Sequence, residues 1–133
     1  SGPRELIEAM SKIQQFTFVC PPTPLQAGVL GAFDVDMDPV VEAYQTRRDM
    51  VISRLRGVTE VPEPGGAFYA FARVPERAAV SATAFVERCV EREVLVVPGG
   101  AFSSRDTHIR LSYAVREDKL GRGLDVLCEL MRG

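Results

Sequence analysis

The 133-residue sequence contains no tryptophan, one histidine and only three cysteines. Cys20, Cys89 and Cys128 are odd in number and widely spaced, and His108 has no cysteine or acidic pair near it in the sequence. A disulfide framework needs paired cysteines and a metal site needs clustered ligands, so the sequence predicts neither. A reduced, cytoplasmic setting is therefore expected.

Long apolar runs and a strong net charge are also missing. No segment approaches the roughly 18 consecutive apolar residues of a membrane helix. We expect no signal peptide before Ser1-Gly2, which we interpret as a cloning remnant. The 16 basic and 18 acidic residues give a formal charge of −2, which offers no electrostatic attraction to nucleic acid or to an anionic membrane. Small molecules and protein contacts are the expected partners.

Apolar residues, by contrast, are plentiful and regularly spaced. A hydrophobic content of 46% gives one domain, residues 1–133, enough material for a core. Spacings of three and four predict helices near residues 3–18, 24–33, 38–57, 81–90 and 117–131. Thr23 and Ser81 are the predicted caps of the second and fourth helices. The prolines of CPPTP, residues 20–24, must end the first helix, because proline lacks the backbone N–H donor.

Alternating and β-branched residues predict four short strands, at residues 58–61, 67–74, 94–97 and 109–114. Each of two Pro-Gly-Gly sequences predicts a turn, and the second, at residues 98–100, should end a strand with glycine at positive φ. The order is three helices, two strands, a helix, two strands and a helix. This order predicts an α+β fold of two layers, with helices packed on one face of a small, mainly antiparallel sheet.

Arg110 is the strongest candidate for a binding residue. It lies on a predicted strand that follows the glycine-rich loop, and a guanidinium matches a carboxylate through two parallel hydrogen bonds. From spacing alone, an ordinary surface arginine on a half-exposed sheet fits the pattern as well. The loop lacks the lysine of a Walker motif and the GxGxxG spacing, so a phosphate-binding role has little support.

Other polar residues give weaker indications of chemistry. His108 is assigned a structural or exposed role, and Ser103-Ser104 and Ser112 lack the GxSxG context of a hydrolase. Ser11-Lys12 resembles the start of a Schiff-base motif, but Lys12 belongs to a regular amphipathic helix. A reactive lysine needs an irregular, buried turn, so Lys12 is predicted to be solvated.

Taken in order, five segments resemble the C-terminal part of the class I/II pyridoxal-phosphate aminotransferases, which have the aspartate aminotransferase fold. They are GPRELIEAMSKIQ, TPLQAGVLGAF, EPGGAFYAFARVP, FVERCVEREVLVVPGGAF, and HIRLSYA with the last helix. The resemblance covers nearly the whole chain. It implies that the VPGGAF loop lies at the mouth of an active site and that Arg110 binds the substrate α-carboxylate. It also implies that Phe102 and Gly99 are substrate-binding residues.

The same resemblance implies what the parent enzyme does and what this chain lacks. The parent would use pyridoxal 5'-phosphate to transfer an amino group from an amino acid to a 2-oxo acid, as a cytoplasmic homodimer. In the family, the Schiff-base lysine and most cofactor ligands precede the position that matches Gly2-Pro3, and neither Lys12 nor Lys119 matches that lysine. The chain is therefore expected to be the small C-terminal domain without its large cofactor-binding domain, with no cofactor bound and no activity alone.

Two alternatives stay open at this point. A lyase, synthase or acyltransferase of the same superfamily would use the same cofactor and the same carboxylate-binding arginine. A free-standing amino-acid-sensing domain is the second alternative. Small sensor domains of the ACT type have the order βαββαβ, and the three predicted leading helices argue against them.

Overall fold

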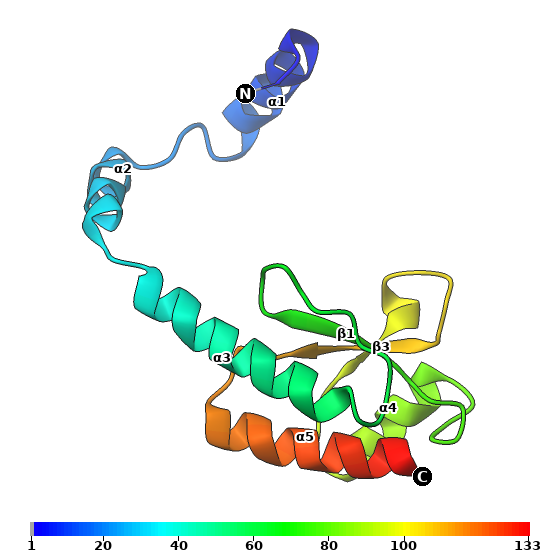
Figure 1. Cartoon of the computed structure of the whole chain (residues 1–133). Helices are drawn as coiled ribbons and strands as arrows, with labels where there is room; N and C mark the ends of the chain where they lie inside the picture. The colour runs from blue at the N-terminus through cyan, green and yellow to red at the C-terminus, as the bar shows by residue number, and fades with distance from the viewer. Residues whose placement is uncertain (1) are drawn as a thin grey trace. The chain divides into compact units, whose positions relative to one another are not determined.

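The computed structural model describes residues 2–133 (Figure 1), so Ser1, and with it part of the proposed cloning remnant, lies outside the described residues. The chain divides into two compact units. The first ends at Met37 and the second comprises Asp38–Gly133. The assignment of residues 1–133 to one domain stays a prediction.

The first unit contains the helices α1 (Arg4–Thr17) and α2 (Thr23–Val29) and the 3-10 helix η1 (Leu30–Asp34). The proline-rich segment separates α1 from α2, as predicted. The prediction that Thr23 caps α2 is wrong, because Thr23 is already helical and Pro22 is the N-cap. The Pro22 carbonyl accepts hydrogen bonds from the N–H groups of Leu25 and Gln26 at 3.0 and 3.1 Å, so the helix begins one residue earlier than expected.

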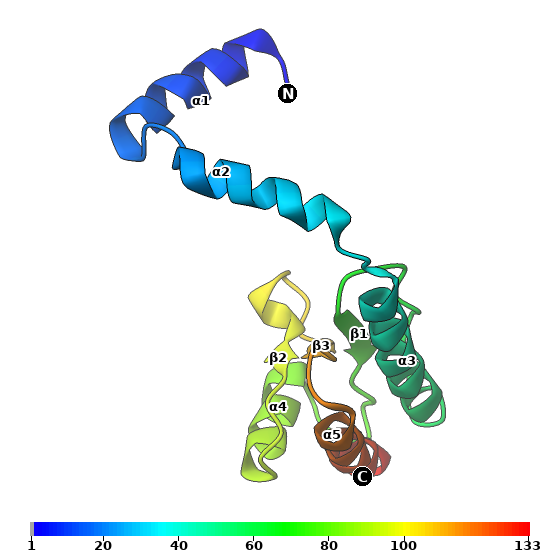
Figure 2. The same ribbon diagram turned by 90° about the vertical axis from the view of Figure 1, so that its left-hand side faces the viewer.

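The second unit is built on a three-stranded antiparallel sheet with the strand order β1-β3-β2. The strands are β1 (Tyr69–Arg73), β2 (Val97–Pro98) and β3 (His108–Ser112). Three helices pack on one face of this sheet, namely α3 (Asp38–Leu55), α4 (Ala82–Glu91) and α5 (Glu117–Arg132). Helices α3 and α5 lie side by side (Figures 1 and 2). The predicted α+β fold class is confirmed.

The core of this unit lies between the sheet and the three helices. Alternate strand residues point into it, and Ile109 of β3 and Phe85 of α4 are completely buried. Ser81 caps α4 as predicted, since its hydroxyl oxygen accepts a hydrogen bond from the Ala84 N–H at 3.2 Å. Within the described chain, none of the helices has the length and apolar composition needed to cross a membrane.

The strand predicted at residues 58–61 is wrong. The Val58 N–H donates to the Leu55 carbonyl at 2.9 Å, which continues the last turn of α3. One backbone hydrogen bond, from the Arg73 N–H to the Glu60 carbonyl at 3.0 Å, joins this segment to β1. Val58 is buried in the core all the same. The alternating pattern therefore comes from an apolar turn that packs inward.

Of the strand predicted at residues 94–97, only Val97 is in a strand, the two-residue β2. The Val94 N–H donates to the Cys89 carbonyl at 2.9 Å, and Glu93 has a positive φ of 60°. These features hold the chain against the C-terminal end of α4. Pairing with β3 begins only at Val97, which lies opposite Arg110.

Candidate functional site

Arg110 lies in the middle of β3, on the face of the sheet opposite the helices. In the strand register it is the partner of Phe71 on one side and of Val97 on the other. Within residues 2–133 its guanidinium forms neither a hydrogen bond nor an ion pair. Other arginines of this unit do pair with carboxylates, as Arg92 does with Glu129 at 2.9 Å. Arg110 is thus a half-buried cation whose hydrogen-bond donors remain available.

Two aromatic rings take the place of a carboxylate partner. The Cζ atom of Arg110 lies 4.4 Å from the centre of the Tyr69 ring and 4.2 Å from the centre of the Phe102 ring. A cation over an aromatic face is attracted by the ring quadrupole, by about 0.5–2 kcal/mol depending on desolvation. The structure therefore brings Phe102, a predicted site residue, into contact with Arg110.

Gly99, the third predicted site residue, begins the short 3-10 helix η2 (Gly99–Ala101), and Phe102 follows as its C-cap. The prediction that this glycine turn needs positive φ is wrong, because neither Gly99 nor Gly100 has a positive φ. Gly99 is required for a different reason. A Cβ atom at this position would lie 2.8 Å from the His108 carbonyl oxygen, so the loop approaches β3 too closely for any side chain.

Asp106 ties the same loop to the beginning of α4. Its carboxylate accepts hydrogen bonds from the Thr83 N–H at 3.2 and 3.1 Å. Hydrogen bonding, first of all from the Thr83 side chain and also from Ser81 and the Gly100 backbone, holds the pKa of the Asp106 carboxyl below its usual value. The loop that carries Phe102 is therefore anchored by a charged cap at a helix N-terminus.

His108 has a packing contact on the same face of the sheet. Its ring stacks on Phe71, with 5.1 Å between ring centroids and an interplanar angle of 3°. Its Nδ1 atom lies 2.9 Å from the Thr107 hydroxyl oxygen. These contacts agree with the structural role that the sequence assigns to His108.

The two lysines of the chain are placed differently from Arg110. Lys12 lies in α1, in the first unit. Lys119 lies in α5 and lines a cavity together with Leu95 and Leu111. Since Leu111 points to the helix-covered face of β3, Lys119 and Arg110 belong to opposite faces of the sheet.

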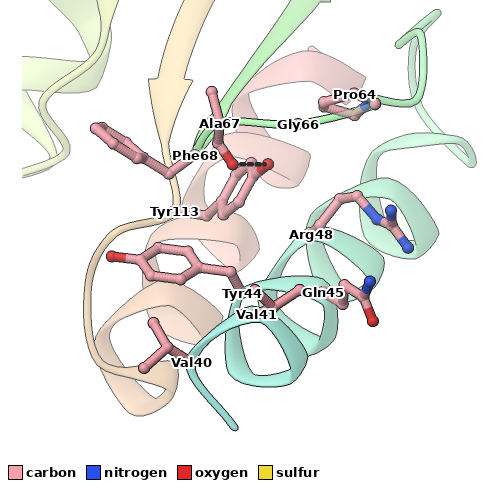
Figure 3. A pocket seen from close by; sticks show the side chains of 11 residues that line it. Val40, Val41, Tyr44, Gln45, Arg48, Pro64, Gly66, Ala67, Phe68 and Tyr113 are labelled. Carbon is pink, nitrogen blue, oxygen red and sulfur yellow. Dashed lines mark hydrogen bonds between the residues drawn. The ribbon is translucent and has the colours of Figure 1, made fainter. Parts of the chain in front are cut away.

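A separate cavity of about 320 Å³ lies between α3 and the loop before β1 (Figure 3). The Tyr113 hydroxyl donates to the Ala67 carbonyl at 3.1 Å beside this cavity, and Gln45 and Arg48 extend from α3. Arg48 is paired with Asp49 at 2.8 Å, and this hydrogen bond raises the pKa of the Arg48 guanidinium. Because its cation is already neutralised by a neighbour, this cavity is a weaker candidate for an anion site than the surroundings of Arg110.

Tyr69 is the site residue that reasoning from the sequence missed. The alternation along β1 does predict that Tyr69 and Phe71 share a face, because Phe71 follows Tyr69 by two residues on the same strand. Which of them contacts Arg110 depends on the pairing of β1 with β3. Phe71 is the direct partner of Arg110 in the register, yet its ring stacks on His108, and the diagonal neighbour Tyr69 covers the guanidinium.

Comparison with known proteins gives a consistent result. The family model described as "Aminotransferase class I and II" matches residues 1–127. An aspartate aminotransferase of Thermotoga maritima is 38% identical over 120 residues, which cover 88% of this chain and 30% of that protein. A probable aspartate aminotransferase of Methanocaldococcus jannaschii is 32% identical over 130 residues, covering 95% of this chain and 34% of that protein.

Solved structures also match over nearly the whole chain. The crystal structure of the Thermotoga maritima aspartate aminotransferase has a TM-score of 0.83 and 33% identity, over 97% of this chain and 34% of that chain. The aromatic aminotransferase of Pyrococcus horikoshii has a TM-score of 0.88 and 28% identity, over 99% of this chain and 37% of that chain. The chain thus spans about a third of the length of the proteins it matches.

Proposed function

Because the chain belongs to the class I and II aminotransferase family, we propose that it is the C-terminal, substrate-binding domain of a pyridoxal-phosphate-dependent aminotransferase. In this proposal Arg110 binds the α-carboxylate of the amino acid and of the 2-oxo acid. The observation that carries the proposal is that the guanidinium of Arg110 has no ion pair within residues 2–133 and lies between two aromatic rings. It lies on the face of the sheet opposite α3, α4 and α5, which we call the open face.

The surroundings of Arg110 suit a small carboxylate. A guanidinium and a carboxylate form two parallel charge-assisted hydrogen bonds, each worth about 1.5–3 kcal/mol when water is excluded. The ring of Phe102 covers one side of the guanidinium, with 4.2 Å between Cζ and the ring centre. Holding the carboxylate at one end fixes the orientation of the bond at Cα that must react.

When bound, pyridoxal phosphate supplies the electron sink for the chemistry at Cα. It needs an amine for attachment as well as donors for its phosphate. Lys119 is on the helix-covered face and Lys12 is in a regular helix, so neither fits an activated lysine beside a carboxylate site. We propose that the cofactor-binding groups lie in a part of the protein outside this chain, and that the chain alone binds no cofactor and transfers no amino group.

The complete protein provides the test. Because the relatives are named aspartate and aromatic aminotransferases, L-aspartate and L-phenylalanine are the first donors to assay, each with and without a 2-oxo acid. We expect product formation that depends on the 2-oxo acid. Release of ammonia or another product without a 2-oxo acid would favour the lyase or synthase alternative, and the absence of any reaction at Cα would contradict the proposal.

The proposal extends to the assembly and location of the parent. We propose that the complete protein is a homodimer in the cytoplasm and that the remainder of its length contacts this chain. Light scattering on the complete protein measures its mass directly. A monomer that retains full transaminase activity would contradict the dimer.

A further inference from the structure

We propose that Tyr69 and Phe102 form an aromatic clamp that positions the Arg110 guanidinium before any carboxylate arrives. The inference rests on the proposed function, because it concerns the same carboxylate site. It adds Tyr69 as a positioning residue, which acts on the substrate through Arg110. Phe102 has the same role from the other side.

The topology of the sheet places the two rings on opposite sides of Arg110. Tyr69 belongs to β1, and Phe102 follows β2 through η2. Because β3 lies between β1 and β2, Tyr69 approaches Arg110 from one neighbouring strand and Phe102 from the loop that follows the other. The distances from Cζ to the ring centres, 4.4 Å for Tyr69 and 4.2 Å for Phe102, are nearly equal.

The half of the clamp formed by Tyr69 is rigidly supported. Its backbone is paired with Ser112 in the regular ladder between β1 and β3. Its ring also contacts the ring of Phe68, with 4.5 Å between centroids. A residue held by a strand and by a neighbouring ring has few alternative positions, so Tyr69 provides a fixed surface for the guanidinium.

The half formed by Phe102 depends on a loop. Phe102 lies outside the strands and is 53% exposed. Its position is set by the close packing of Gly99 against β3 and by the anchoring of the loop through Asp106. Phe102 is thus the side of the clamp that is carried by an anchored loop.

A clamp of this kind has a physical purpose. An arginine without a partner carries about 2 kcal/mol of rotamer freedom, and fixing it on binding opposes association. Two rings that hold the guanidinium in advance remove part of this cost, while its N–H donors stay free for a carboxylate. Loss of either ring should therefore weaken the binding of α-carboxylates without removing the charge.

The first test observes the clamp directly in the 133-residue chain. In ¹⁵N-labelled protein, the Nε–Hε signal of Arg110, assigned by its loss in Arg110→Lys, should be shifted upfield by ring currents. Tyr69→Leu and Phe102→Leu should each move the signal toward the position of an exposed arginine. Tyr69→Phe and Phe102→Tyr, which keep the rings, should leave it in place. An Arg110 signal that is unchanged in both leucine variants would overturn the clamp.

The second test measures its consequence in the complete enzyme. Tyr69→Leu should raise KM for the amino acid by about tenfold, with a smaller change in kcat, and Tyr69→Phe should restore the normal KM. If Tyr69→Leu fails to fold, Phe102→Leu tests the same clamp, because Phe102 is on an exposed loop. A normal KM in a folded leucine variant, or failure of Tyr69→Phe to restore it, would overturn the positioning role.

The two tests separate this inference from the proposed function. If the complete protein shows no amino transfer, the proposed function fails, and the Arg110 signal still decides whether the clamp exists. If Arg110→Lys raises KM but both leucine variants leave it unchanged, Arg110 binds the carboxylate and the positioning role of the rings is overturned.

Discussion

The two faces of β3 carry different chemistry on one five-residue strand. Ile109 and Leu111 are buried against the helices, at 0% and 4% exposure. His108 and Arg110 alternate with them on the open face and are only half-buried. The buried face fixes the backbone, and because the backbone is fixed, the open face can present an unpaired cation at a defined place. The comparison separates residues that stabilise the fold from the arginine that is proposed to bind substrate.

The largest effect on stability is expected on the buried face. Ile109→Ala should lower the free energy of unfolding by about 2–5 kcal/mol, since it removes apolar contacts and leaves a cavity. Urea unfolding of the chain measures this. Leu95, which is 85% exposed, is the matched control, and Leu95→Ala should change stability by less than about 0.5 kcal/mol. Equal losses in the two variants would contradict the assignment of the core.

A smaller effect is expected where the loop meets the open side of the sheet. Gly99→Ala should cost about 1–3 kcal/mol, because the new Cβ would lie 2.8 Å from the backbone oxygen of His108. Thermal unfolding of the chain measures the loss. In Gly100→Ala, the control, the nearest atom is an oxygen of Asp106 at 3.5 Å, which is an ordinary contact. The account of the loop fails if Gly100→Ala is as destabilising as Gly99→Ala.

The smallest effect is expected at Asp106, and it depends on pH. Because the pKa of Asp106 is lower in the folded chain than its usual 3.8, the carboxylate stabilises the fold above that value. This contribution is lost as the pH falls below 3.8 and through the lowered pKa. The Tm of the unsubstituted chain should therefore fall more steeply with acid than the Tm of Asp106→Asn. Parallel Tm curves from neutral to acidic pH would show that the carboxylate contributes nothing.

Features that depend on local chain geometry were predictable from the sequence. Helical spacing located α3, α4 and α5, and Ser81 was recognised as a cap because the cap interaction spans only a few residues. The turn at Val58 cannot be distinguished from a strand by sequence pattern, because an apolar turn that packs inward has the same alternation as a strand. Distinguishing the two requires knowledge of the hydrogen bonds.

The candidate site was predictable only in part, because some of its contacts join residues far apart in the sequence. Arg110, Phe102 and Gly99 follow from the resemblance to a family, while the contact with Tyr69 depends on the register of two strands almost forty residues apart in the chain. The need for glycine at position 99 is also non-local, because a side chain there would collide with the carbonyl oxygen of His108, nine residues later. Spacing alone predicts a positive φ that Gly99 does not have.

The central claim is that Arg110, and no other arginine of the open face, binds the substrate carboxylate. Arg73 is the matched control, because it is on the same face in β1 but pairs with Glu60 at 3.7 Å. The measurement is KM for the amino acid in complete enzyme carrying Arg110→Lys or Arg73→Lys. The account predicts a KM raised by about tenfold or more for Arg110→Lys, where the guanidinium fork is lost although the charge is kept, and a normal KM for Arg73→Lys. An unchanged KM in the Arg110 variant would contradict it.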